Sequence, residues 1–452
     1  MNTLQYERPV IVKLNSGMMN KFGTKTEYSA VTNIDGAPVK DLIKEFGSPL
    51  FVLSERKMRD NYRNAKRIFE TRYPKVQFAW SYKTNYINAV CNIFHQEGSW
   101  AEVVSRFEYE KALKNGVPGD KILFNGPDKS EDDLKLAIKN NSPIHIDHLD
   151  ELYRLTELAE GSKTKPRVAI RVNMDTGIYP MWDRFGFNYE NGQAWDAINK
   201  IMAGGKLNLI GLHCHIGTYM LTTSAYAVAA SKMADLALGV RNRYGKSITY
   251  IDMGGGFASK NTLKGSFHVG ADIVPEISQF AEAITSTLLN AGFGADELPY
   301  LYLETGRALI DDAGYLLGSV ISNKRLSDGR RATILDFGVN ILFTSFWYDH
   351  KISPAQPFGH HTEDCVLYGP LCMNIDVVRE NITLPPLSPG DQVVVHHVGA
   401  YNISQSMQFI ALRPAVVVID MKGVPQLVKK KEKLSTLELD EVMPEYLSKF
   451  KL

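Results

Sequence analysis

The feature that most constrains the fold is a regular alternation, through the middle of the chain, between short apolar runs and helical patterns. Near-continuous apolar runs are typical of parallel strands that are buried on both faces and joined by helices. The expected strands are 76–82, 99–105, 121–126, 143–147, 167–173, 209–217, 248–254 and 300–305. The expected helices are 55–72, 86–96, 106–115, 130–140, 149–159, 194–203, 223–243 and 274–291. Eight such units over about 250 residues predict an α/β fold, a (β/α)8 TIM-type barrel rather than an open, doubly wound sheet.

After about residue 310 the pattern changes to short strands separated by turn residues, expected at 313–322, 331–336, 364–369, 392–397, 408–411 and 414–420. This half predicts a second, all-β domain of the β-sandwich or Greek-key kind. A chain of 452 residues is also longer than one ordinary core. We therefore expect a barrel domain at 48–309 and a β domain built from 310–452, to which the N-terminal segment 1–47 contributes.

Composition argues against several classes of partner. The net charge of +1 provides no field for nucleic acid or for an anionic membrane. No apolar segment reaches the roughly 18 residues of a membrane span, and Met1–Leu14 lacks a signal-peptide core. The 4 cysteines show no C-x-x-C spacing, which predicts neither a metal site nor a disulfide framework. We expect a cytoplasmic protein that holds no metal.

Reactive residues end four of the expected strands. Lys83, His215, the Gly254–Gly256 run and Glu304 each lie at or just beyond the end of a different one. The carboxyl ends of barrel strands meet at one mouth, where the chemistry of this fold takes place. An amine, an imidazole, an anion cradle and an acid are the groups needed to hold an aldehyde cofactor with a phosphate and a pyridine ring. Lys83 would be its Schiff-base partner.

Each of these residues also has an ordinary structural interpretation. A lysine at a strand end can be a surface cap, and three glycines can form a tight turn instead of a phosphate cradle. His215 either lies flat on a cofactor ring or is a core histidine bonded to a carbonyl group. Arg307, at the end of the next strand, either completes an anion site or forms a salt bridge at the start of a helix.

Glu304 matters most for mechanism, because a carboxylate at the end of a buried strand is costly unless it is paired. A pyridinium N–H would give it a charge-assisted hydrogen bond worth roughly 1.5–3 kcal/mol and would keep that ring able to accept electrons. The alternative partner is a structural arginine or lysine. In the β half, Cys372 is either a proton donor or a core thiol, and Tyr401 is either a phosphate ligand or a core tyrosine.

Taken together, these motifs resemble the pyridoxal-phosphate decarboxylases with an alanine-racemase-type barrel (fold type III), which include the diaminopimelate, ornithine and arginine decarboxylases. The resemblance runs from about Ser48 to Pro414 and is greatest to the diaminopimelate branch, of which the chain looks like a divergent paralogue. The segments Ser81–Asn85, reading Ser-Tyr-Lys-Thr-Asn, and Ala101–Glu108 carry it best. It implies a carboxy-lyase of amino-acid metabolism that depends on pyridoxal 5′-phosphate.

The resemblance also implies a set of site residues. Lys83 matches the Schiff-base lysine, Glu304 the acid at the pyridine nitrogen, and His215 the histidine stacked on the ring. The other cofactor-binding positions are Glu102, Thr218, Gly254, Gly255, Gly256, Gly306, Arg307 and Tyr401. Cys372 matches a cysteine that family members insert from the second subunit, which implies a homodimer with shared active sites. Arg184 and Asp376 occupy the places of a pair that meets across this interface in some members.

Departures from the family concern the far end of the substrate. Diaminopimelate decarboxylases follow the cysteine with a glutamate that holds the distal ammonium, but Met373 and Asn374 stand here. Thr344 replaces the arginine that grips the distal carboxylate, although Tyr348 is kept. Hydrogen bonds to charged groups are worth roughly 1.5–3 kcal/mol each, so the loss of both should strongly disfavour a zwitterionic side-chain end. We expect these four residues to bind the substrate in a rebuilt, more apolar pocket.

The expected function is therefore the α-decarboxylation of an amino acid to an amine and carbon dioxide, with Lys83, Glu304, His215 and Cys372 as catalytic residues. An uncharged or conjugated side chain, such as that of an amino acid tethered to a carrier protein, would suit the pocket. Genuine diaminopimelate, ornithine or lysine decarboxylase activity is the first alternative. An amino-acid racemase and a non-catalytic regulatory homologue are further alternatives, but racemases of this barrel place an arginine where Glu304 stands.

Overall fold

The computed structural model describes residues 29–160, 164–266, 270–294, 296–359 and 361–448. Its first part is a closed barrel of parallel strands, which confirms the expected (β/α)8 architecture. The barrel strands are β4 (Val76–Ser81), β5 (Trp100–Val103), β6 (Ile122–Phe124), β7 (Ile144–Ile146), β8 (Arg167–Asn173), β10 (Asn208–Cys214), β11 (Tyr250–Asp252) and β12 (Tyr300–Thr305). They run in the order β10-β11-β12-β4-β5-β6-β7-β8, and β8 pairs with β10 to close the barrel. The short β9 (Phe187–Asn188) adds to β8.

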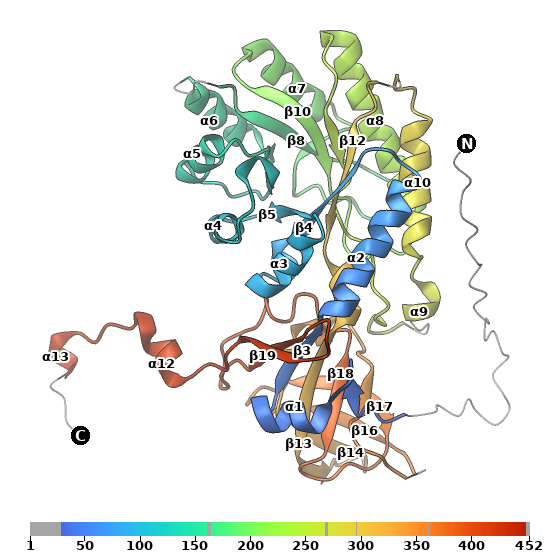
Figure 1. The fold of residues 1–452 in the computed structure, drawn as a ribbon, viewed down its shortest axis with the longest axis vertical. Coiled ribbons are helices and arrows are strands. Elements are labelled where there is room, and N and C mark those ends of the chain that lie inside the picture. The colour runs from blue at the N-terminus through green and yellow to red at the C-terminus, as the bar shows by residue number, and fades with distance from the viewer. Residues whose placement is uncertain (1–28, 161–163, 267–269, 295, 360, 449–452) are drawn as a thin grey trace.

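Helices cover the outside of the barrel (Figure 1). They are α2 (Glu55–Glu70), α3 (Asn88–Gln96), α4 (Arg106–Lys114), α5 (Glu131–Lys139), α6 (Leu149–Ala159), α7 (Gln193–Gly204), α8 (Ser224–Tyr244) and α10 (Ile277–Leu289). The local sequence explains where they begin and which face they bury. The hydroxyl of Ser54 accepts the Lys57 N–H at the start of α2. The buried face of α2 consists of Met58, Tyr62, Ala65 and Phe69, whose spacing follows one side of a helix.

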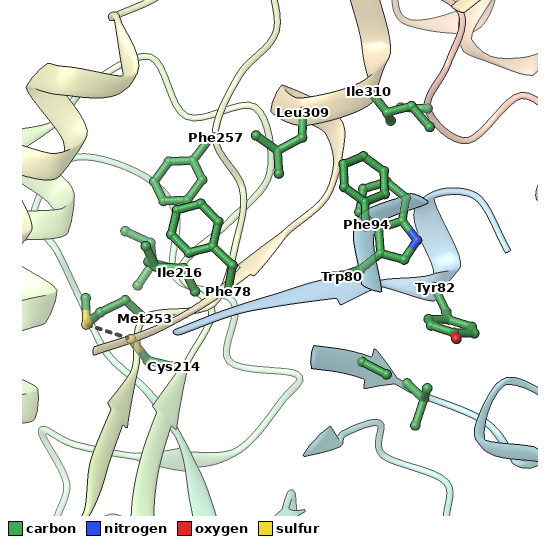
Figure 2. Close-up of a cluster of buried hydrophobic side chains, with 14 of the residues drawn as sticks. Phe78, Trp80, Tyr82, Phe94, Cys214, Ile216, Met253, Phe257, Leu309 and Ile310 are labelled. Atoms are coloured by element: carbon green, nitrogen blue, oxygen red, sulfur yellow. Dashed lines mark hydrogen bonds between the residues drawn. The ribbon is translucent and has the colours of Figure 1, made fainter. Parts of the chain in front are cut away.

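Aromatic packing holds the strand that leads to Lys83. Phe78 and Trp80 of β4 are fully buried in the cluster of apolar side chains shown in Figure 2. The Trp80 ring stacks on Phe94 of α3, with the ring centroids 3.9 Å apart and the planes at 15°. Side chains alternate across a strand, so Ala79 and Ser81 face the barrel interior. This packing fixes the end of β4 at the mouth of the barrel.

The second part of the chain is a mostly β domain, below the barrel in Figure 1. Its strands are β3 (Leu50–Ser54), β13 (Gly314–Arg325), β14 (Arg331–Leu335), β15 (Ile352–Pro354), β16 (Glu363–Tyr368), β17 (Val377–Leu384), β18 (Gln392–His396), β19 (Ala415–Ile419) and β20 (Pro425–Lys429). The main path is β17-β16-β14-β13-β3-β19-β20, and β18 pairs with β13 and β15. The expected strand at 408–411 is wrong, because this stretch contains only the isolated bridge between Phe409 and Ala411. β17 escaped prediction because exposed polar residues interrupt its apolar pattern.

β3 belongs to the β domain, although it lies within the range 48–309 that we expected for the barrel domain. β3 pairs antiparallel with β13 and parallel with β19. All five of its residues are buried, and such a short apolar run does not indicate which sheet it joins. We therefore propose that the barrel domain begins near Glu55, at the start of α2.

The N-terminal segment packs on the β domain over its described part. It forms β1 (Asn33–Ile34), β2 (Ala37–Pro38) and α1 (Val39–Phe46), and Val31 N–H donates to the carbonyl of Pro354 at 2.8 Å. At the other end of the chain, α12 (Leu434–Leu437) and α13 (Glu445–Ser448) extend away from both domains (Figure 1). In the described part of the chain, none of the helices combines the length and apolarity that a membrane crossing needs.

Candidate active site

Lys83 lies at the barrel mouth, in the short 3-10 helix η1 (Tyr82–Thr84) that follows β4. Its Nζ donates to both carboxylate oxygens of Glu102 on β5, at 2.9 and 2.8 Å. The Glu102 side chain has no exposed surface. Burial opposes the charge on Lys83, but the carboxylates of Glu102 and Glu304 outweigh it and raise the pKa of this amine above its usual value. The structure therefore places Lys83 as a held amine rather than as a surface cap.

Glu304 lies inside the barrel on β12 and is 5% exposed. Its Oε1 accepts a hydrogen bond from the Asn125 amide and lies 3.2 Å from His213 Nε2. The same amide donates to Glu102 Oε1 at 3.0 Å. Neither of these two partners is an arginine or a lysine, the residues that the structural interpretation of Glu304 expected, as far as the described part of the chain shows. Asn125 was not among the expected site residues, although it follows β6 and so reaches the same mouth.

His215 follows β10 and stands beside the glycine run. Its Nδ1 accepts the Gly255 N–H at 3.0 Å. Burial lowers the pKa of His215 to about 3, so the ring is neutral at physiological pH. With Nδ1 as an acceptor, the ring hydrogen lies on Nε2. Trp182 packs edge to face on this imidazole, with the centroids 5.5 Å apart, and helps to fix its orientation.

The glycines that follow β11 form a backbone cradle. Gly254 and Gly256 have φ values of 66° and 90°, which favour glycine over other residues. A Cβ on Gly255 would collide with the carbonyl oxygen of Glu304. The run therefore needs glycine for its conformation and for its close approach to β12. Backbone N–H groups of such a turn can bind an anion, and in this structure those of Gly254 and Gly255 donate to Asp252 Oδ1 and His215 Nδ1.

Arg307 begins the short helix α11 (Arg307–Ile310), directly after Gly306. Its guanidinium donates to the Tyr348 hydroxyl and, at 3.5 Å, to Thr218 Oγ1. It also lies over the Tyr401 ring, 4.6 Å from the centroid. These partners are hydroxyls and an aromatic ring rather than the carboxylate of a helix-start salt bridge. A guanidinium held in this way beside the glycine cradle suits a phosphate group.

Two adjoining cavities bring the expected residues together. The smaller is lined by Ser81, Lys83, Thr84, His215, Thr218, Gly255, Gly256, Phe257, Glu304, Gly306, Arg307, Ala308 and Tyr401. The larger has a volume of about 390 Å³, and its lining includes Lys83, Glu102, Asn125, Glu304 and Tyr401. Lys83 and Glu304 line both cavities. The amine and the acid therefore face one space, as a shared cofactor requires.

The larger cavity also has walls that the sequence did not reveal. They include Arg171, Trp182, Phe185, Trp347 and Gln405. The Arg171 guanidinium lies 4.4 Å from the Phe185 ring centroid. Trp182 and Phe185 come from the long loop between β8 and β9, and Trp347 follows the 3-10 helix η4 (Phe343–Phe346). The cavity wall therefore includes three aromatic side chains, Trp182, Phe185 and Trp347, together with Arg171 and Gln405.

The residues expected to bind the substrate do not all reach this cavity. Thr344 is 1% exposed, and its hydroxyl lies 2.8 Å from His350 Nε2 and 2.9 Å from Asn402 Oδ1. Trp347 lines the cavity three residues further on. Tyr348 is 2% exposed and directs its hydroxyl at Arg307. The structure therefore gives Thr344 and Tyr348 partners within the protein.

Cys372, Met373 and Asn374 lie on the loop between β16 and β17. Cys372 and Asn374 are exposed, Met373 is half-buried, and none of the three is among the described residues that line the two cavities. Asp376, expected to meet Arg184 across an interface, is only 2% exposed. Its carboxylate oxygens accept the N–H groups of Val339 and Leu371, both at 2.8 Å. Asp376 thus holds its own loop.

The residues at the barrel mouth fit pyridoxal phosphate. The glycine cradle and Arg307 suit its phosphate, and Lys83 offers an amine to its aldehyde. The neutral His215 imidazole suits the face of the ring. Glu304 offers a buried carboxylate to a ring nitrogen, held in place by Asn125. Each chemical part of this group therefore finds a matching side chain or backbone segment around one cavity.

Comparison with known proteins agrees with this fit. Residues 56–311 match the family described as "Pyridoxal-dependent decarboxylase, pyridoxal binding domain". A diaminopimelate decarboxylase of Methanothermobacter thermautotrophicus is 30% identical over 436 residues, which cover 92% of this chain and 96% of that protein. The crystal structure of diaminopimelate decarboxylase from Methanocaldococcus jannaschii in complex with L-lysine has a TM-score of 0.84 at 28% identity, covering 93% and 98% of the two chains. A lysine/ornithine decarboxylase from Vibrio vulnificus, complexed with putrescine, shares the fold with a TM-score of 0.71 at 23% identity, covering 84% and 96%.

Proposed function

The chain belongs to the pyridoxal-dependent decarboxylase family, and from this premise we propose which residues perform its chemistry and what kind of substrate it takes. It is a pyridoxal-phosphate-dependent amino-acid decarboxylase, which releases carbon dioxide and an amine. One observation best supports our assignment of roles. Lys83 and Glu304 line the same cavity, and Glu102 and Asn125 link them through hydrogen bonds.

Lys83 would hold the cofactor, and the cradle of Gly254–Gly256 would bind its phosphate together with Arg307 and Tyr401. When bound, pyridoxal phosphate supplies an aldehyde for amines and a ring that accepts the electron pair left on Cα when carbon dioxide departs. Glu102 would orient the Lys83 amine through its bidentate contact. Thr218, whose hydroxyl lies near Arg307, would complete the phosphate end of the site.

Glu304 would hold a proton on the ring nitrogen. A hydrogen bond of this kind between charged groups is worth roughly 1.5–3 kcal/mol. Asn125 and His213 contact the same carboxylate oxygen and keep it inside the barrel. His215 is neutral, so it can lie against the ring without adding charge to it. An acid at this position supports decarboxylation over racemisation, since barrel racemases place an arginine there.

Cys372 would deliver the proton that Cα needs after carbon dioxide has left. Its side chain is exposed on the β domain, away from the cavities of its own chain. This placement supports a homodimer in which the β16–β17 loop of one copy completes the site of the other. Met373 and Asn374 would then reach the substrate from the same loop.

We further propose that the substrate carries an uncharged or conjugated side chain. The larger cavity has Trp182, Phe185 and Trp347 in its wall, and Thr344 offers no charge to a distal carboxylate. An amino acid tethered to a carrier protein or to another metabolite would fit this description. The alternative is diaminopimelate itself, which the relatives' names favour; the cavity wall also contains Arg171, whose guanidinium lies 3.6 Å from a carboxylate oxygen of Asp147.

Carbon dioxide release tests these proposals. The purified protein with pyridoxal phosphate would be offered meso-diaminopimelate, lysine, ornithine, glutamate derivatives and amino acids whose side chains are amidated or acylated. We expect release from a conjugated substrate at a higher kcat/KM than from diaminopimelate. Mass spectrometry of the product separates decarboxylation from racemisation, which leaves the mass unchanged. Preference for free diaminopimelate would overturn the substrate proposal and leave the reaction class intact.

A further inference from the structure

A cluster of buried polar side chains lies inside the barrel around Glu304. It consists of His145 on β7, His213 on β10, Asp252 on β11 and Glu304 on β12, and one nitrogen or oxygen atom from each lies within 4.8 Å of those of the others. All four are buried, with exposed fractions of 5% or less. Nearby, the stacked rings of Tyr250 and Tyr302, 4.3 Å apart, belong to the apolar interior of the barrel.

Only one of the two carboxyl oxygens of Asp252 has a hydrogen-bond partner among the described residues. Oδ1 accepts the Gly254 N–H at 2.8 Å, which also shapes the glycine cradle. Oδ2 is buried and has no hydrogen-bond partner among the described residues. Glu304 Oε1, in contrast, accepts from Asn125 and lies beside His213 Nε2. Asp252 Oδ2 is thus a buried carboxyl oxygen that is free to carry a proton.

Two neighbouring carboxylates in a dry interior do not both stay ionised, because each is desolvated and each repels the other. Burial first, and then the charges of Glu304 and Glu102, raise the pKa of Asp252 well above its usual value. The imidazoles of His145 and His213 face the same cluster from β7 and β10. Burial lowers the pKa of both well below the usual value, so they bring no compensating positive charge. The thiol of Cys214 is likewise neutral, because burial raises its pKa.

We propose that Asp252 is a positioning residue that stays protonated and donates from Oδ2 to Glu304, so that Glu304 is the anionic carboxylate of this pair. Asp252 would then connect the two halves of the cofactor site. Its Oδ1 accepts the Gly254 N–H and so helps to shape the glycine cradle, and its Oδ2 would order the acid that is proposed to bind the ring nitrogen. This inference rests on the proposed role of Glu304, but the protonation of Asp252 can be measured without reference to catalysis.

Infrared spectroscopy of the holoenzyme labelled with carbon-13 aspartate tests the protonation directly. The measurement would be made two pH units above the pKa of about 6 that burial gives Asp311, the other strongly shifted buried aspartate, so that Asp311 is ionised. We expect one carboxylic-acid band that persists at this pH, is lost in Asp252→Asn and is retained in Asp311→Asn. No such band, or a band that survives in Asp252→Asn, would overturn the proposal. If the wild-type holoenzyme shows the carboxylic-acid band but releases no carbon dioxide from any amino acid, the result would count against the proposed function and not against the protonation of Asp252.

Cofactor affinity tests the positioning role. In Asp252→Asn the amide oxygen can still accept from Gly254 and the amide nitrogen can still donate to Glu304, whereas Asp252→Ala removes both bonds. We expect the alanine variant to bind pyridoxal phosphate about tenfold or more weakly, as the loss of a hydrogen bond to a charged group implies. Asparagine should recover most of that loss. If both variants lose cofactor affinity to the same extent, the proposal is contradicted. One equivalent of bound zinc in the purified protein would also contradict it, because a cation at these atoms would displace the proton. If the alanine variant does not fold, the infrared result on Asp252→Asn decides.

Discussion

The Asn125 amide donates to the Glu304 carboxylate across the barrel interior, from the end of β6 to β12. The same nitrogen donates to Glu102, which holds the Lys83 amine. A neutral side chain that appears in no expected set of catalytic residues therefore couples the two ends of the cofactor site. Its removal should affect both ends at once.

We predict that Asn125→Ala weakens pyridoxal phosphate binding and lowers kcat by about ten- to a hundredfold. The variant loses hydrogen bonds to two carboxylates, each worth roughly 1.5–3 kcal/mol. Cofactor titration and carbon dioxide release measure the two effects. Asn64→Ala, on the exposed face of α2, is the matched control and should change neither. An Asn125→Ala variant with normal affinity and turnover would show that the bridge is incidental.

Lys83→Ala should abolish the visible absorbance that arises when the cofactor is linked to a lysine. Of the lysines described, Lys83 is the one whose side chain lines both cavities. Absorption spectra after reconstitution provide the measurement, and borohydride reduction followed by peptide mapping identifies the linked residue. Lys260→Ala, at an exposed lysine, should retain the band. A band that persists without Lys83 would place the anchor elsewhere.

Glu102→Gln should move the pH dependence of cofactor uptake to lower pH. Burial alone would lower the pKa of Lys83, and the Glu102 and Glu304 carboxylates raise it instead. Without one of these anions the amine loses its proton at a lower pH, by about one unit or more for a carboxylate at this distance. The rate of absorbance growth against pH, measured on cofactor-free protein, gives the midpoint. Glu282→Gln, on the surface of α10, should leave the midpoint in place. An unshifted midpoint in Glu102→Gln would show that this contact does not control the amine.

The barrel and much of its mouth could be predicted because the signals are local. Lys83 and Glu304 each end an apolar strand, and parallel strands bring their carboxyl ends together in this fold. Trp182 and Trp347 could not be placed in this way. They belong to loops, and their directions depend on how the barrel closes and how the β domain packs beside it.

Two local patterns in the sequence had more than one tertiary solution. β3 is buried along its whole length, so its sequence does not indicate which sheet it joins, and in the structure it pairs with β13 and β19. Thr344 occupies the position that matches a substrate-binding arginine. In η4, however, its hydroxyl turns into the core towards Asn402, and Trp347 faces the cavity instead.

Cys372→Ala should retain the cofactor but lose most amine production, because its thiol is proposed to protonate Cα. The shared-site proposal makes a sharper prediction. When Cys372→Ala and Lys83→Ala chains are unfolded together and refolded, half of the dimers are mixed, and each mixed dimer has one site with both residues intact. Activity should then recover to about a quarter of the wild-type value, as two-fold symmetry requires. No recovery would mean that both residues act within one chain, and an unchanged rate in Cys372→Ala alone would remove the thiol from the mechanism.

Glu108 should make the stability of the fold depend on pH near neutrality. It is 3% exposed, its Oε2 accepts the Val104 N–H at 2.8 Å, and burial raises its pKa from 4.5 to about 7. The folded chain therefore holds a proton that the unfolded chain releases between these values, so the contribution of Glu108 to stability is full below pH 4.5 and is lost as the pH rises to 7. Glu108→Gln does not titrate, so its free energy of unfolding should gain on the wild type between pH 5 and pH 8, by up to about 3 kcal/mol. Urea unfolding at the two pH values measures this gain, and Glu110→Gln on the exposed face of α4 serves as the control. If the difference in unfolding free energy between Glu108→Gln and the wild type does not change with pH, Glu108 is ionised in the folded protein.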